Sequence, residues 1–159
     1  LRTPVAALAN SAEINGIMPP FSTEYFACSG GAHFVLGHIG FDEYSSATPD
    51  GKEVSREACL RRLARMVCAD LEEIGEEGAL HIAESFWAAQ RDLVCTAVEK
   101  VRKDAGADPL LVGGIGSSTF APLTGGVDLT SALGIPADAL PAYSVREIAG
   151  VLERSYGTV

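Results

Sequence analysis

A glycine-rich stretch in the later half of the sequence has the residue types best suited to binding a ligand. Residues 111–119 are Leu-Val-Gly-Gly-Ile-Gly-Ser-Ser-Thr, an apolar pair followed by three glycines and three hydroxyl side chains. Glycines without Cβ atoms let a ligand approach main-chain N–H groups, and neighbouring hydroxyls add hydrogen-bond donors. We therefore predict a strand followed by a turn that binds a phosphate or a nucleotide. The candidate cofactor-binding residues are Gly113, Gly114, Gly116, Ser117 and Ser118.

Neither of the two common phosphate-loop motifs accounts for this stretch. Its glycine spacing does not fit G-x-G-x-x-G, and no lysine follows as in a Walker loop. The alternative is a tight strand-to-helix turn that binds nothing. A G-x-S-x-G nucleophile elbow is also absent, and no histidine is placed by the sequence as a base for a serine, so hydrolytic serine chemistry is disfavoured.

The three histidines do not form a metal-binding pattern. His33, His38 and His81 match neither H-x-x-x-H nor H-E-x-x-H. Because His33 and His38 are five residues apart, they share no face of a helix, so we expect each histidine to have a surface or core packing role. We predict no protein-bound metal cluster.

Other polar residues are candidates for contacts with a substrate. The segment Arg2-Thr3 is polar within an otherwise apolar start and could face a cleft. Glu24 lies at the start of a helix expected from near Thr23 with Ser22 as its cap, where a carboxylate also interacts favourably with the helix dipole. Asp50 lies in a turn around Gly51 and is expected to be solvated if it has no other role.

Helical periodicity dominates residues 23–104, and Gly30-Gly31 should weaken or kink the first helix. A polar loop over 41–54 precedes a helix capped by Ser55 and stopped by Gly75, with three arginines on its exposed face. A longer helix over 79–104 ends at Gly106. Residues 110–159 comprise a short strand at 110–112, the glycine turn, irregular connections at 120–123 and 133–136, a brief strand near Leu129, and a last helix over 144–156. The three arginines on the exposed face of the helix that follows Ser55 are Arg61, Arg62 and Arg65.

Composition restricts the function classes. The 159 residues are 47% hydrophobic and 21% charged with a formal net charge of −9, which indicates a folded domain and disfavours nucleic acid as a partner. No apolar run approaches the roughly 20 residues of a membrane span, and no leader pattern is visible, so we expect a cytoplasmic protein without a membrane partner. The four cysteines, without a C-x-x-C pair, are expected to be buried free thiols.

Several segments, taken in order, resemble one family. The chain is similar to the hydantoinase/oxoprolinase-like group of tetrahydromethanopterin-linked C1-transfer proteins. This resemblance implies an α/β fold of the actin/sugar-kinase/Hsp70-like (ribonuclease H-like) type, with two lobes around a nucleotide cleft. The chain would be the later part of that fold, a single α/β region over 1–159, with the main phosphate loops lying upstream of Leu1. The segments that carry the resemblance are Leu1–Leu8, Glu24–Ala27, residues 48–51 with Arg62–Met66, and Val112–Ser118.

The resemblance also implies a function and roles for residues. It implies a transferase of methanofuran biosynthesis that joins a tyramine phenol to an activated aminomethylfuran diphosphate and releases pyrophosphate. Arg2 and Glu24 become the candidate catalytic residues, Thr3 and Asp50 the candidate substrate-binding residues, and the glycine turn the adenosine-side loop. Mg²⁺ and either ATP or a diphosphate-bearing ligand are the implied cofactors, with a small-molecule substrate and a homo-oligomer as partners. The alternatives are an ATP-dependent kinase or hydantoinase/oxoprolinase-like hydrolase on the same fold, and a non-catalytic lobe that binds a nucleotide or a partner.

Overall fold

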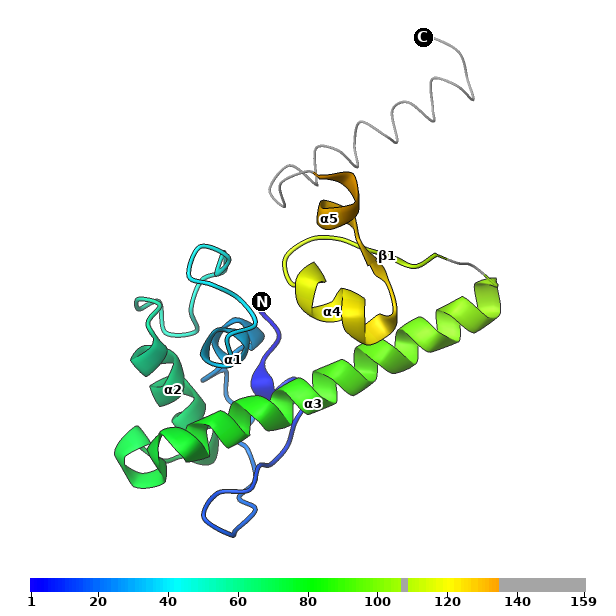
Figure 1. Cartoon of the computed structure of the whole chain (residues 1–159). Coiled ribbons are helices and arrows are strands. Elements are labelled where there is room, and N and C mark those ends of the chain that lie inside the picture. Colours follow the sequence, from blue (N-terminus) through cyan, green and yellow to red (C-terminus); the bar gives the residue numbers. More distant parts are fainter. Residues whose placement is uncertain (107–108, 135–159) are drawn as a thin grey trace, which may run out of the picture. The chain divides into compact units, whose positions relative to one another are not determined.

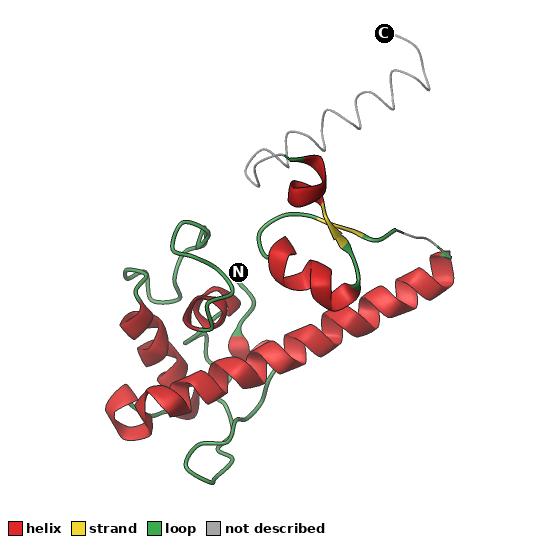
Figure 2. Ribbon diagram, in the orientation of Figure 1, coloured by secondary structure: helices red, strands yellow, loops and turns green. Residues whose placement is uncertain are grey.

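A computed structural model describes residues 1–106 and 109–134. The described residues are mostly helical, and their one regular sheet has two parallel strands (Figure 2). The chain divides into two compact units, Leu1–Ala97 and Val98–Val159, each of which is considered by itself. The predicted helix over 144–156 lies outside the described residues. Within the described part of the chain, no helix combines the length and apolarity needed to cross a membrane.

The first unit is helical and contains the hydrophobic core. Its elements are the 3-10 turn η1 (Val5–Ala7), α1 (Ser29–Val35), α2 (Arg56–Ala64), η2 (Arg65–Val67) and the greater part of α3 (Leu71–Ala105). Helices α1 and α2 pack against each other (Figure 1). The largest fully buried apolar side chains come from η1, α2, η2 and α3, so these elements share one core. They are Val5, Leu63, Met66, Ile82 and Phe86.

The first residues of the chain lie along the start of α1. The Ser29 N–H donates to the Thr3 carbonyl at 2.8 Å, and the Thr3 N–H donates to the Ser29 hydroxyl at 3.2 Å. An antiparallel bridge pairs Pro4 with Cys28. The main chain of Thr3 is therefore held by the first turn of α1.

The prediction of a helix from near Thr23 is wrong, because α1 begins at Ser29. The Ser22 hydroxyl accepts from the Glu24 N–H at 3.2 Å, and this local bond stabilises a bend instead of a helix. Gly30 of α1 has a packing role that the sequence did not reveal. A Cβ on Gly30 would lie 2.9 Å from Tyr44 Cζ and 3.1 Å from the Leu1 carbonyl oxygen, so this glycine allows a close approach.

The ends of the next helices follow the sequence signals in part. Ser55 caps α2, as predicted, by accepting from the Ala58 N–H at 3.1 Å. The helix does not continue to Gly75, because Cys68 takes a left-handed conformation (φ +56°) after η2 and turns the chain into α3. Gly75 does interrupt the helical conformation (φ +69°), and Gly106 (φ +58°) follows the end of α3, as predicted.

The second unit places the glycine-rich stretch between a strand and a helix. Strand β1 (Leu111–Val112) pairs with β2 (Val127–Asp128), and helices α4 (Ser117–Thr124) and α5 (Leu129–Leu133) follow these strands. The predicted strand before the glycines is confirmed, and the brief second strand ends just before Leu129.

The prediction of an irregular connection over 120–123 is wrong, because α4 continues through Pro122. A proline lacks the N–H needed for one helical bond, so it usually marks an interruption. Here it lies near the end of a helix of only eight residues, and the Thr124 hydroxyl donates to the Phe120 carbonyl at 2.8 Å. Gly125 then ends α4 in a left-handed conformation (φ +62°). Likewise, Leu133 and Gly134 form the end of α5 and its left-handed cap.

Candidate functional site

The glycine turn exposes the start of α4. Gly114 and Gly116 have φ values of +101° and +86°, which only glycine adopts readily. The Ser117 N–H donates to the Gly114 carbonyl, and the Phe120 N–H donates to the Gly116 carbonyl, each at 3.0 Å. The turn thus closes directly into the first turn of a helix, whose dipole favours negative charge at this end.

A carboxylate lies at this helix start. Ser117 is buried, with 7% of its surface exposed, and its hydroxyl hydrogen-bonds to Asp128 at the end of β2. The Thr130 and Ser131 hydroxyls also donate to Asp128, at 2.7 Å and 2.8 Å to Oδ2. Hydrogen bonds from Ser117, Thr130 and Ser131, in that order, hold the pKa of Asp128 well below its usual range.

Asp128 restricts what the glycine turn can bind. Its negative charge lies beside the first residue of α4, so it opposes an uncompensated phosphate there. A ligand with hydroxyl or amino donors, or a diphosphate accompanied by a cation, is compatible with the same charge. The Ser117 hydroxyl already binds Asp128, whereas Ser118 is exposed. Sequence reasoning missed Asp128, although the succession Asp-Leu-Thr-Ser is a typical helix cap.

In the first unit, the segments that carry Arg2 and Glu24 lie close together. The Tyr25 hydroxyl, next to Glu24 in the chain, donates to the Arg2 carbonyl at 3.5 Å. Arg2 and Glu24 are both exposed, and Thr3 is half-buried. Glu24 does not begin a helix, so the helix-dipole role expected for it is wrong. Two exposed groups of opposite charge on adjoining segments remain available to a ligand.

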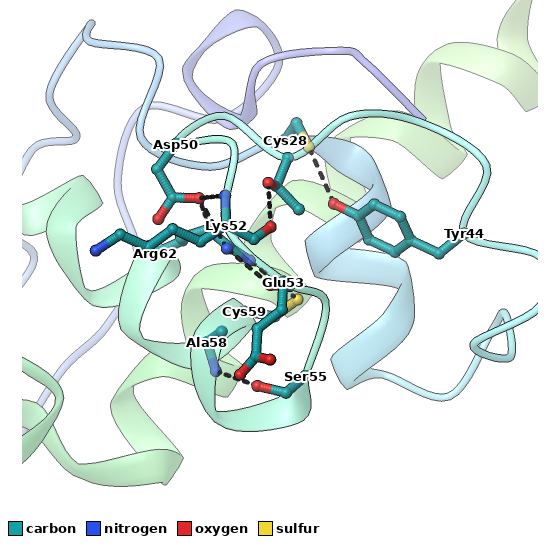
Figure 3. A network of polar contacts seen from close by, with 10 residues as sticks. Cys28, Tyr44, Asp50, Lys52, Glu53, Ser55, Ala58, Cys59 and Arg62 are labelled. Atoms are coloured by element: carbon teal, nitrogen blue, oxygen red, sulfur yellow. Dashed lines mark hydrogen bonds and ion pairs between the residues drawn. The ribbon is translucent and has the colours of Figure 1, made fainter.

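Asp50 is part of an ion pair with a buried arginine (Figure 3). Arg62 is only 4% exposed, and its guanidinium donates to Asp50 Oδ1 from Nε at 2.9 Å and to the Glu53 carbonyl from Nη2 at 2.9 Å. Burial raises the pKa of Asp50, but the hydrogen bonds from Arg62 and from the Lys52 N–H outweigh it and lower that pKa below its ordinary value. The pair therefore connects the 48–53 loop to α2.

The expectation that Arg62 belongs to an exposed helix face is wrong. Arg62 lies three residues after Cys59 and four before Met66, and both of these residues are buried. That spacing places Arg62 on a buried face of the helix. The signal was therefore present in the sequence as a charge at an apolar-face position.

Two thiols and a phenol lie near this ion pair (Figure 3). Cys28 Sγ and Tyr44 Oη are 3.6 Å apart, and Arg62 Nη1 lies 3.9 Å from Cys59 Sγ. Burial raises the pKa of the Tyr44 phenol and of the Cys59 thiol, so both remain protonated at neutral pH. All four cysteines are free. Cys28 and Cys59 are buried as predicted, but Cys68 is exposed and Cys95 is only half-buried.

His33 and His38 meet although they share no face of one helix. Helix α1 ends at Val35, and Gly37 (φ +74°) turns the chain back. As a result, His33 Nδ1 and His38 Nδ1 are 3.0 Å apart. His33 is buried, and its Nε2 lies 2.7 Å from Gln90 Oε1 on α3. A pattern search that assumes a continuous helix cannot find this pair.

Comparison with known proteins identifies the family. The hydantoinase/oxoprolinase family model matches residues 6–146. The chain belongs to the hydantoinase/oxoprolinase family. It is also 33% identical over 116 residues to the (4-{4-[2-(γ-L-glutamylamino)ethyl]phenoxymethyl}furan-2-yl)methanamine synthases of Methanocaldococcus jannaschii and Methanococcus vannielii. The match covers 73% of this chain but only 35% and 52% of those two proteins, respectively.

For this hydantoinase/oxoprolinase chain, the predicted site residues fall into two groups. Arg2, Thr3, Glu24 and Asp50 belong to the first unit, and the residues of the glycine turn belong to the second. Among the described residues, no group of three or more histidine, cysteine, aspartate or glutamate side chains is arranged to hold a metal ion. The roles assigned to all these residues stay predictions.

A shallow hollow of about 370 Å³ lies in the first unit where η2 meets α3. None of the predicted site residues lines it. Its lining combines an aromatic ring and an exposed thiol with charges of both signs, so it has no consistent preference for an anion or a cation. The lining residues are Phe26, Arg65, Cys68, Ala69, Asp70 and Glu73.

Proposed function

We propose that this chain is part of a transferase of methanofuran biosynthesis that joins a tyramine phenol to an activated aminomethylfuran diphosphate and releases pyrophosphate. The observation that carries the proposal is the 33% identity to two archaeal synthases whose name describes a phenoxymethylfuran amine. The family match over residues 6–146 supports a related fold and ancestry.

The chemistry requires stabilisation of a leaving diphosphate. The C–O bond between the furan methylene and the diphosphate breaks, and the electron pair leaves on oxygen, so negative charge develops there. The exposed Arg2 guanidinium is the group of the first unit that suits that charge. In the second unit, Asp128 would suit a Mg²⁺ ion if a diphosphate bound at the glycine turn, since Mg²⁺ is usually bound by one or two carboxylates together with phosphate oxygens.

The same reaction requires a group that interacts with the attacking phenol. The phenol oxygen forms the new bond to the methylene carbon and loses its proton. Glu24 is exposed beside the segment that carries Arg2, so its carboxylate is available for that contact, and Thr3 and Asp50 are proposed to bind other polar parts of the substrates. An unchanged turnover number in a Glu24→Gln variant would remove Glu24 from this role.

The second candidate is an ATP-dependent kinase or a hydrolase on the same actin-like fold. The description of the matching family, hydantoinase/oxoprolinase, favours it. The glycine turn would then be the adenosine-side loop, and Asp128 would accept hydrogen bonds from hydroxyl or amino groups of the nucleoside.

One experiment separates the two candidates. The full-length protein is mixed with the aminomethylfuran diphosphate and γ-glutamyltyramine, and pyrophosphate is measured. Release that depends on both substrates and needs no ATP supports the transferase. ATP consumption without formation of the ether overturns it in favour of the second candidate.

A further inference from the structure

The histidine pair of the first unit is a hydrogen-bonded chain with a defined direction. Gln90 Oε1 can only accept, so the proton at the 2.7 Å contact belongs to His33 Nε2. In a neutral imidazole the other nitrogen then carries a lone pair, so His33 Nδ1 must accept from His38 Nδ1 across 3.0 Å. This order fixes the tautomers of both rings.

The second ring nitrogen of His38, Nε2, is left as a hydrogen-bond acceptor. With its proton on Nδ1, neutral His38 presents a lone pair at Nε2, and this atom has no hydrogen-bond partner among the described residues. The ring is half-buried and lies against Trp87, with centroids 4.7 Å apart. The Trp87 ring of α3 thus restricts the orientation of His38, whose outer nitrogen remains available.

The surroundings keep the pair neutral at neutral pH. Burial lowers the pKa of His33; the hydrogen bond with Gln90 raises it, and His38 and the Leu1 amino group lower it. Burial also lowers the pKa of His38. The other groups that face the pair are Phe86 and Trp87, which carry no charge. In the described part of the chain, no carboxylate forms an ion pair or a hydrogen bond with either ring.

We propose that His38 is the general base that receives the phenol proton through Nε2, with His33 and Gln90 as positioning residues. This inference rests on the proposed function. The phenol O–H proton passes to His38 Nε2, the phenol oxygen forms the bond to the methylene carbon, and pyrophosphate leaves with the electron pair. His38 then carries both ring protons, and its Nδ1–H remains bound to His33 until the Nε2 proton passes to water.

An imidazole suits this step better than Glu24 does. The ordinary pKa of histidine is about 6.5 and that of glutamate about 4.3, whereas a phenol has a pKa near 10. A base is more effective when its pKa lies closer to the operating pH, provided that it is unprotonated there. A base held by a second residue, which is itself held by a third, is also the general arrangement of activated catalytic groups.

The decisive variant is His38→Gln in the full-length protein, compared with Glu24→Gln and with His81→Gln as the matched control. His81 is the third histidine of the chain, and its Nδ1 hydrogen-bonds to the Glu13 carbonyl at 2.9 Å. We expect His38→Gln to lower kcat by 10²-fold or more and to remove the acidic limb of the kcat profile against pH, since a general base contributes about 10²–10⁴-fold. His81→Gln should leave both unchanged.

The positioning residues are tested by a separate readout. His33→Gln should lower kcat with little change in KM and should shift the acidic limb of the pH profile. In the ¹⁵N-histidine-labelled wild-type protein, NMR correlation of ring nitrogens with ring protons should report the Nε2–H form of His33 and the Nδ1–H form of His38. Loss of signals in the His33, His38 and His81 variants assigns the rings.

The outcomes separate a failure of the proposed function from a failure of the assignment of His38 as the base. Absence of pyrophosphate release from the wild-type protein overturns the proposed function and the base assignment with it. An active wild-type protein whose His38→Gln variant keeps its rate and pH profile overturns the base assignment alone, and a loss confined to Glu24→Gln transfers the role to that carboxylate. An Nε2–H tautomer at His38 also overturns the assignment, because that nitrogen would then be a donor.

Discussion

Replacing Arg62 by methionine should lower the free energy of unfolding of the first unit by about 3 kcal/mol. The variant keeps an unbranched apolar side chain but loses the bond to Asp50, at about 1.5–3 kcal/mol for a charged group, and leaves the Glu53 carbonyl without its donor, at about 1–3 kcal/mol. Breaking a buried ion pair typically costs about 3–5 kcal/mol. We expect the lower end of this energy range, because the Asp50 side chain is 26% exposed and still accepts a hydrogen bond from the Lys52 N–H at 3.2 Å.

Urea unfolding followed by circular dichroism measures this effect, with Arg65→Met as the matched control. Arg65 is exposed in the 3-10 turn that follows α2, so its replacement should change the unfolding free energy by less than about 0.5 kcal/mol. Asp50→Asn should cost about 1–2 kcal/mol, and the double variant with Arg62→Met should cost less than the sum by about 1 kcal/mol, as expected for groups in contact.

The dependence on pH gives a further check. Since the pKa of Asp50 is lowered in the folded state, its contribution is present above the unfolded value of about 3.9 and is lost as the pH falls through the folded value. The difference between the wild-type protein and Arg62→Met should therefore narrow below about pH 4. A cost for Arg62→Met no larger than that for Arg65→Met, or a difference that does not change with pH, would refute the reasoning.

Three other predictions concern close packing and burial. A Cβ on Gly126 would lie 2.7 Å from Val112 Cγ2, so Gly126→Ala should destabilise the strand pair by about 1–3 kcal/mol, seen as faster amide exchange at Val127; unchanged exchange would contradict it. Gly30→Ala should displace the Tyr44 ring and lower the melting temperature, whereas the same change at Gly31, whose Cβ would have ordinary 3.7 Å contacts, should do so less. Because burial lowers the pKa of His33, its neutral form contributes fully to the free energy of unfolding above about pH 6.5, and this contribution is lost as the pH falls through the pKa of His33 in the folded state. His33→Gln should make the free energy of unfolding, measured by urea titration, less dependent on pH in this range.

Local signals predicted much of the secondary structure. The Ser55 cap, the helix interruption at Gly75, the end at Gly106 and the strand before the glycines all follow from backbone preferences that act within a few residues. The helix expected near Thr23 failed because the Ser22 hydroxyl binds a neighbouring N–H in a bend, an alternative that the same residue types allow.

The polar groups of the first unit were harder to predict, because tertiary contacts determine them. The position of Arg62 on the apolar face of α2 indicates that it is buried, but its partner Asp50 lies twelve residues earlier and only the fold brings the two together. His33 and His38 meet only because α1 stops at Val35 and the chain turns at Gly37. Helical spacing excludes such a contact, so a rule based on continuous helices gives the wrong answer wherever a helix ends between the two residues.

The glycine turn shows how a motif and its environment can have opposite electrostatic effects. Gly114 and Gly116 expose the start of a helix, which alone favours an anion. Asp128 hydrogen-bonds to Ser117, the first residue of that helix, and the low pKa of Asp128 keeps its negative charge at all ordinary pH values. A diphosphate at this turn therefore requires a cation that compensates Asp128, whereas a nucleoside with hydroxyl or amino donors does not. Binding of a diphosphate should therefore depend on Mg²⁺ in the wild-type protein, and this dependence should be lost in Asp128→Asn. Binding of a nucleoside at the same turn should not depend on Mg²⁺.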